Sequence, residues 1–212
     1  MTGVQTCALP ILNHVFYKGF FGLIKLLIPS CRWRIPTAVR EIRSSVIVCN
    51  HRSYLDPILL ISIYAHHTTI AKARLFDIPV LGKVLTLSGY IPSTARGRFA
   101  DLMVDRMEGM GRFLASGGNV FIFPEGTRSR DGRIGSLNKG AFKLAKICKA
   151  PVKVLFIENT DKLFAPGKFL FNAHRPNTVT VALVGEMDPD YQSDPFSISG
   201  LMAEVHALLE KT

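Results

Sequence analysis

The clearest indication of the fold is the segment SVIVCNHRSYLD, residues 45–56. Its first five residues form a short β-branched run, which predicts a buried strand. The polar residues that follow lead into residues 57–64, which have helical character and a proline near the first turn. The stretch therefore predicts a strand, a polar turn and a helix, and functional side chains collect at such turns in α/β proteins.

The same alternation continues along the rest of the chain. Further strands are predicted at residues 68–71, 89–91, 119–123, 152–157 and 178–184, and further helices at 79–87, 99–115, 139–149 and 197–209. Strands separated by helices predict an α/β fold with a mixed, mostly parallel sheet flanked by helices. The 212 residues suit a single domain, and no internal repeat, low-complexity run or linker divides them.

The first 11 residues, MTGVQTCALPI, match the translation of a common sequencing-library adapter residue for residue. We therefore expect residues 1–11 to be an artefact that carries no information about the native fold, and the native chain to begin upstream of Leu12. A genuine short leader is the alternative.

Residues 12–30 are largely apolar and aromatic, Lys18 and Lys25 interrupt the run, and Pro29 ends it. The run is short for a membrane-spanning helix, which needs about 20 mostly apolar residues. It predicts a helix that lies in a membrane interface. The side chains expected to face lipid are Phe16, Phe20, Phe21, Leu23 and Leu27. The alternative is an ordinary helix that covers the core of the domain.

Charge and cysteines narrow the function classes. Lys and Arg total 26 against 16 Asp and Glu, which gives a net charge of +10. Such an excess implies an anionic partner, namely nucleic acid, an anionic membrane surface or a phosphate-bearing substrate. No DNA-binding or RNA-binding signature is present, so we do not expect nucleic acid. Cys7, Cys31, Cys49 and Cys148 form no C-x-x-C pair, which predicts free thiols and no metal site.

The first candidate site is the turn that holds His51 and Asp56. An aspartate five positions after a histidine can fold back and hold one imidazole nitrogen, which leaves the other free to take a proton. A hydroxyl nucleophile needs such a base, because an alcohol is a weak nucleophile at neutral pH. The alternative is that Asp56 only caps the following helix.

The second candidate site is FPEGTRSR, residues 123–130, which follows another predicted strand. Gly126 permits a tight turn and close approach to a ligand. Arg128 offers a planar fork of donors that suits phosphate oxygens. Glu125 could order the arginines or contact a substrate hydroxyl, and Thr127 adds a hydroxyl donor. The alternative is a polar turn with solvated arginines.

Together, NHRSYLDP and FPEGTRSR resemble the first and third sequence blocks of the glycerolipid acyltransferases, whose best-known members are 1-acylglycerol-3-phosphate acyltransferases. Their order and separation also fit. The resemblance implies a glycerol-3-phosphate acyltransferase-like fold for residues 31–212. It also implies that His51 is the general base and Asp56 orients it. The acceptor site would then consist of Glu125, Gly126, Thr127 and Arg128.

The intermediate block departs from the family pattern. The family often has an arginine six positions after a glycine, but here that offset from Gly89 falls on Ala95. Arg96 takes the phosphate-binding role if the loop carries one extra residue, and Arg98 is a further candidate. Lys72 matches a lysine commonly present after the second strand and could face an anionic group. The alternative is that these are ordinary basic loop residues.

The resemblance implies transfer of a fatty acyl group from acyl-CoA or acyl-carrier protein to the free hydroxyl of 1-acylglycerol-3-phosphate, which makes phosphatidate. No metal and no cofactor beyond the acyl donor are expected. Alternative acceptors are a lyso-ornithine lipid, glycerol 3-phosphate and other lysophospholipids. A catalytically idle lipid-binding module is the alternative from another class. We expect the chain at the cytoplasmic face of a membrane, peripheral or N-terminally anchored, in the bacterial inner membrane.

Overall fold

A sheet of seven strands forms the centre of the computed structural model, which describes residues 8–94, 97–129, 132–165, 168 and 170–211. The strands are β1 (Cys31–Arg34), β2 (Val46–Cys49), β3 (His67–Ala71), β4 (Ile91–Pro92), β5 (Asn119–Ile122), β6 (Val152–Glu158) and β7 (Asn177–Met187). Their order across the sheet is β1-β7-β6-β2-β5-β3-β4. Neighbouring strands are parallel except β6 and β7, which confirms the predicted mixed, mostly parallel sheet.

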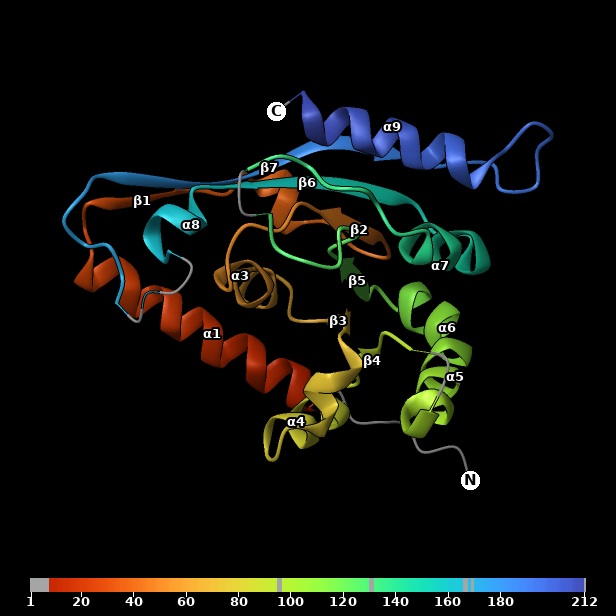
Figure 1. Cartoon of the computed structure of the whole chain (residues 1–212), viewed down its shortest axis with the longest axis horizontal. Helices are drawn as coiled ribbons and strands as arrows, with labels where there is room; N and C mark the ends of the chain where they lie inside the picture. Colours follow the sequence, from red (N-terminus) through yellow and green to blue (C-terminus); the bar gives the residue numbers. More distant parts are fainter. Residues whose placement is uncertain (1–7, 95–96, 130–131, 166–167, 169, 212) are drawn as a thin grey trace.

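Helices cover both faces of the sheet (Figure 1). One face carries α1 (Ala8–Leu27), α3 (Leu55–Ile63), the 3₁₀ helix η1 (Ala73–Asp77) and α4 (Leu81–Leu87). The other carries α5 (Ala100–Glu108), α6 (Met110–Ala115), α7 (Gly140–Cys148) and α9 (Ile198–Glu210). The short helices α2 (Thr37–Arg40), α8 (Thr160–Leu163) and η2 (Gly97–Phe99) lie in connections between the longer elements.

The central strand β2 explains why residues 45–56 indicate the fold so clearly. Successive side chains of a strand point to opposite faces of its sheet. Ile47 and Cys49 pack into the core beneath α1 and α3, whereas Val46 and Val48 pack into the core beneath α7 and α9. All four residues are buried. A strand buried on both faces needs a continuous apolar run, and the sequence supplies one.

One predicted helix is wrong in its extent. Residues 99–115 do not form a single helix but α5 and α6, which meet at Gly109. Glycine is the poorest helix former after proline, so a helix breaks easily at this position. The remaining long helices lie close to their predicted ranges, and Ser197 caps α9 by accepting a hydrogen bond from the Gly200 N–H at 2.9 Å.

Helix α1 combines features of both interpretations of residues 12–30. The prediction that Phe20 and Phe21 face lipid is wrong, because Phe21 is buried against Trp33 and Phe20 packs against Phe171. Phe16, Leu23 and Leu27 are exposed, as are Ile11, Leu12, Val15 and Leu26. In the described part of the chain, no helix is both long and apolar enough to span a membrane. Membrane contact and the adapter origin of residues 1–11 stay predictions.

Candidate active site

His51 and Asp56 meet at the carboxyl end of β2. The Nδ1 atom of His51 lies 2.9 Å from Oδ2 of Asp56. Asp56 lies fully buried in the first turn of α3, and the same oxygen accepts hydrogen bonds from the N–H groups of Arg52 and Ser53, both at 2.7 Å. Because the carboxylate accepts, Nδ1 carries the hydrogen of a neutral imidazole. That arrangement leaves Nε2 as the nitrogen that can take a proton from a substrate.

Thr160 completes the surroundings of Asp56, and sequence reasoning missed it. Its hydroxyl donates to Oδ1 of Asp56 at 2.6 Å, and Thr160 is itself fully buried. A buried carboxylate is costly unless its oxygens are hydrogen-bonded, so this contact helps to hold Asp56 in place. Thr160 follows β6, which is parallel to β2 and adjacent to it. The signal was therefore a polar side chain at the carboxyl end of a neighbouring parallel strand.

The loop after β5 forms hydrogen bonds with both the backbone N–H and the backbone carbonyl group of His51. The His51 N–H donates to Oε1 of Glu125 at 3.1 Å. The Ser129 N–H donates to the carbonyl oxygen of His51 at 2.8 Å. In addition, the His51 ring stacks on Phe123 with 4.4 Å between ring centroids. The structure thus brings together the two sequence blocks, which lie more than 70 positions apart in the chain.

Glu125 stabilises this loop through hydrogen bonds to both of its carboxylate oxygens. Its second oxygen, Oε2, accepts a hydrogen bond from the Gly135 N–H at 3.0 Å, so backbone donors contact both carboxylate oxygens. Gly126 adopts a φ of +67°, and a Cβ there would meet the Asn138 amide nitrogen at 3.2 Å. Only glycine adopts this left-handed conformation without strain. Glu125 and Gly126 therefore shape the loop, and Thr127 lies exposed on it.

Arg128 is the predicted phosphate ligand whose surroundings best fit an anion. Its guanidinium lies over the ring of Tyr54, with 3.6 Å from Cζ to the ring centroid. Its Nη1 atom is buried and has no hydrogen-bond partner among the residues that the structure describes. A buried charged donor without a partner is costly. An oxygen of a bound phosphate would satisfy it in the geometry that guanidinium prefers.

The three remaining basic candidates, Arg96, Lys72 and Arg98, differ in their surroundings. Arg96 lies outside the described residues. Lys72 is exposed and directly follows β3, so it lies at the same edge of the sheet as His51. Arg98 forms an ion pair with Asp77, and its guanidinium lies 4.7 Å from the ring centroid of Phe99. Arg98 is therefore already engaged by the protein.

Cys49 is the thiol next to the candidate site, and it is a poor nucleophile. Complete burial, with a smaller contribution from the charge of Asp56, raises the pKa of Cys49 well above its ordinary value. The thiolate is the reactive form of cysteine, so this side chain stays protonated and inert. Among the described residues, no group of three or more His, Cys, Asp or Glu side chains is placed to hold a metal ion.

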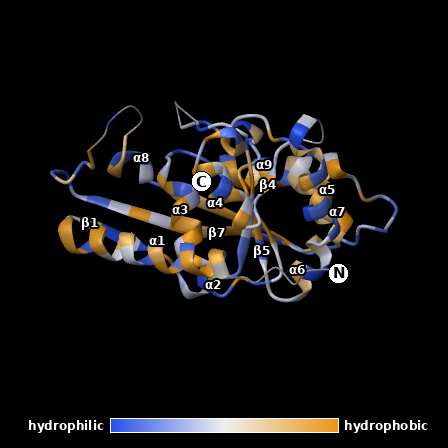
Figure 2. Cartoon of the chain, turned by 90° about the horizontal axis from the view of Figure 1, so that it is seen from below, coloured by the Kyte–Doolittle hydropathy of each residue, from blue (hydrophilic) through white to orange (hydrophobic). Residues whose placement is uncertain are grey.

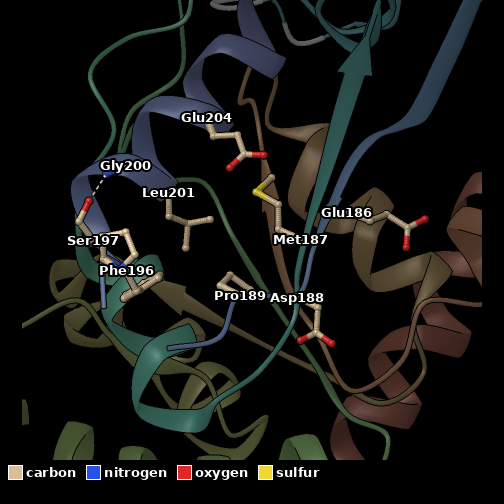
Figure 3. Close-up of a pocket in the computed structure, with 10 residues that line it drawn as sticks. Glu186, Met187, Asp188, Pro189, Phe196, Ser197, Gly200, Leu201 and Glu204 are labelled. Atoms are coloured by element: carbon tan, nitrogen blue, oxygen red, sulfur yellow. Dashed lines mark hydrogen bonds between the residues drawn. The ribbon is translucent and has the colours of Figure 1, made fainter. Parts of the chain in front are cut away.

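A hollow of about 450 Å³ lies between the end of β7 and the start of α9 (Figure 3). Met187 in its wall pairs with Val152, the first residue of β6. The hollow is therefore at the opposite edge of the sheet from His51, which follows the last residue of the parallel strand β2. Its wall also carries the carboxylates of Glu186, Asp188 and Glu204. These negative charges would repel a phosphate-bearing acceptor.

The fold and the joined loops define the class of protein. A family model described as Acyltransferase matches residues 31–157, more than half of the chain, and the chain belongs to this family. Proteins similar to this chain include named lipid acyltransferases. A 1-acyl-sn-glycerol-3-phosphate acyltransferase from Brassica napus is 36% identical over 122 residues, which are 58% of this chain and 35% of the relative.

A human relative, 1-acyl-sn-glycerol-3-phosphate acyltransferase beta, is 30% identical over 171 residues, 79% of this chain and 57% of its own. The crystal structure of the 1-acyl-sn-glycerophosphate acyltransferase PlsC from Thermotoga maritima superposes with a TM-score of 0.68. The superposition covers 93% of this chain and 77% of the Thermotoga maritima chain at 22% identity, which shows that the two share a fold. The chain spans about a third of the length of the plant relatives.

Proposed function

We propose that this chain transfers a fatty acyl group from acyl-CoA or acyl-carrier protein to the free hydroxyl of 1-acylglycerol-3-phosphate, which yields phosphatidate. The observation that supports this acceptor is the buried Nη1 of Arg128, for which the described residues offer no hydrogen-bond partner. Arg128 lies in the loop that also contacts the His51 backbone. The family supports acyl transfer, and the names of the relatives support this acceptor.

The reaction follows from the placement of His51. Nε2 removes the proton of the acceptor hydroxyl as its oxygen attacks the thioester carbonyl carbon. The tetrahedral intermediate collapses, the carbon–sulfur bond breaks and an ester forms. The imidazolium returns its proton to the departing sulfur, so His51 ends neutral and a free thiol leaves. Asp56 stabilises the imidazolium through Nδ1. Phe123 and Thr160 keep the ring and the carboxylate in position.

The acceptor is tested with purified protein, one acyl-CoA and a panel of hydroxyl acceptors. The panel consists of 1-acylglycerol-3-phosphate, 1-acylglycerol, glycerol 3-phosphate and a lyso-ornithine lipid. We expect the highest kcat/KM with 1-acylglycerol-3-phosphate and a large loss when only the phosphate is removed. Equal rates with and without the phosphate would contradict the role of Arg128. Replacing acyl-CoA by acyl-carrier protein in the same assay identifies the donor.

We further propose that the exposed side of α1 contacts an anionic membrane surface. From Leu12 onward, six exposed apolar side chains lie along this helix together with Lys18 and Lys25, and such a mixture suits the interface of a bilayer. The test is co-sedimentation with vesicles that contain phosphatidylglycerol. Leu26→Asp, at an exposed position on α1, should weaken binding by about tenfold. Unchanged binding would argue against the contact.

A further inference from the structure

The segment between β3 and β4 presents an apolar surface that neither the motifs nor the predicted membrane helix accounts for. It consists of η1, a tight turn and α4. We call its exposed apolar side chains the α4 patch: Ile78, Val80, Leu81, Val84 and Leu87. Val80, Val84 and Leu87 repeat at helical spacing. Buried faces of helices usually show this pattern, but here it faces outward.

The backbone around the α4 patch is fixed, so these side chains are not free to turn inward. Val80 has a φ of 67° and a ψ of −58°, and the Leu81 N–H donates to the Pro79 carbonyl oxygen at 2.8 Å. This is a classic γ-turn, which is rare and strained for a β-branched residue. A Cβ on Gly82 would lie 2.0 Å from the Phe76 carbonyl oxygen, so α4 packs closely on η1. Strain of this kind points to function.

The end of α4 lies close to the N-terminal part of α1. Asn13 in α1 donates from Nδ2 to the Ser88 hydroxyl, just after α4, at 2.8 Å. The inward side chains of the two helices belong to one core cluster, which contains Phe21 from α1 and Leu85 from α4. Both helices therefore cover the same face of the sheet, and both turn apolar side chains outward. Figure 2 shows this side of the molecule from below, with hydrophobic colouring along α1.

The charges around the α4 patch favour an anionic partner. Lys72, Arg74 and Lys83 are exposed in the same segment. Its single acidic residue, Asp77, is paired with Arg98. An apolar surface with a rim of positive charge matches a bilayer in which anionic headgroups surround acyl chains. A patch of exposed apolar side chains in one small segment marks an interaction surface in general, and the charge selects the kind of partner.

We propose that the α4 patch is a second membrane contact, which rests with α1 on the surface of an anionic bilayer. This inference builds on the proposed function, because an enzyme with a lipid acceptor works at a membrane. Two contacts on the same face of the sheet would fix the orientation of the protein on the bilayer as well as its attachment. Lys72 links the patch to β3, so the same orientation sets the edge of the sheet that carries His51 relative to the lipid.

The experiment compares two variants with the same chemical change on opposite faces of the sheet. Leu87→Asp changes the α4 patch, where Leu87 is 71% exposed, and Ile147→Asp changes α7, where Ile147 is 69% exposed. Vesicles of phosphatidylcholine with and without phosphatidylglycerol serve as probes. We expect Leu87→Asp to lower binding to the anionic vesicles by about tenfold and Ile147→Asp to leave it within about twofold of the wild type.

Equal binding by the two variants would overturn the proposal. So would a change in self-association of Leu87→Asp in sedimentation velocity without a change in vesicle binding, because the patch would then contact a second copy of the chain. Acyl transfer measured with dispersed short-chain substrates keeps the two proposals apart. If wild type shows no transfer but Leu87→Asp loses vesicle binding, the proposed function fails and the membrane contact stands.

Discussion

Two charged side chains of the candidate site, Asp56 after β2 and Arg128 after β5, differ in how far the protein itself satisfies their polar atoms. Asp56, in the first turn after the β2 loop, accepts four hydrogen bonds although it is fully buried. Arg128, in the β5 loop, keeps a buried Nη1 for which the described residues offer no acceptor. The His51–Asp56 pair, which we propose for proton transfer, is therefore fully hydrogen-bonded at its carboxylate without a ligand. The Arg128 guanidinium, in contrast, would gain its missing acceptor from a bound anion.

The strongest test of this comparison removes the base. We expect His51→Ala to lower kcat by roughly 10²- to 10⁴-fold, because a positioned general base contributes about that much. Steady-state assays at saturating acceptor measure this loss. Vesicle binding and thermal unfolding should stay close to the wild type, since the His51 peptide keeps its two hydrogen bonds with the β5 loop. Wild-type activity in this variant would refute the assigned role.

The second test removes the Arg128 guanidinium. Arg128→Gln should lower kcat/KM for 1-acylglycerol-3-phosphate by roughly 10- to 100-fold, because a hydrogen bond to a charged group contributes about 1.5–3 kcal/mol. Most of the change should be in KM. Activity on 1-acylglycerol, which lacks the phosphate, serves as the control and should change little. A similar loss on both acceptors would mean that Arg128 supports the loop and not the phosphate.

The third test removes one of the four hydrogen bonds that Asp56 accepts. Thr160→Val keeps the shape of the side chain and removes the hydrogen bond to Oδ1 of Asp56. We expect kcat to fall by about tenfold, because the carboxylate loses one of its charge-assisted hydrogen bonds. KM for the acceptor should stay unchanged, and the pH dependence of kcat should shift. Thr160→Ser should restore the activity. Equal loss in the Val and Ser variants would point to packing alone.

The smallest effect on activity is expected from a change at His67, a buried histidine away from the candidate site. It hydrogen-bonds to the Tyr64 carbonyl and to the Tyr90 hydroxyl, and burial lowers the pKa of His67 to about 4. The unfolded chain binds this proton near pH 6.5, so stability from neutral His67 is full above that pH and is lost as the pH falls toward 4. The difference corresponds to about 3 kcal/mol.

Denaturant unfolding at pH 7 and at pH 4.5 measures this loss. His67→Gln can make both contacts without titrating, so it should remove much of the difference between the two pH values and leave kcat at pH 7 nearly unchanged. A difference as large as in the wild type would assign the acid sensitivity to other groups.

The sequence predicted the central strands and the position of the site because both depend on local patterns. The four consecutive apolar residues of β2 predict a buried strand, and a polar turn directly after such a strand indicates a candidate site. Thr160 could not be found in this way. Its contact with Asp56 spans 104 positions and depends on β6 lying next to β2. Strand order is a property of the whole chain and not of any segment.

The orientation of α1 shows a second limit of sequence reasoning. Phe20 and Phe21 are chemically suited to lipid, but Phe21 meets Trp33 and Phe20 meets Phe171. An apolar side chain is equally satisfied by a protein core and by a bilayer. Only the position of its neighbours separates these two outcomes, and those neighbours lie far along the chain.

The hydrogen bonds around His51 and Asp56 determine when, during synthesis of the chain, this pair can be held in place. His51 and Asp56 are translated before Glu125, Ser129 and Thr160, which hold them, and Thr160 lies 104 positions after Asp56. A nascent chain that ends before residue 160 contains both residues of the pair without the groups that position them. Acyl transfer should therefore begin only after Thr160 has been translated and has reached Asp56.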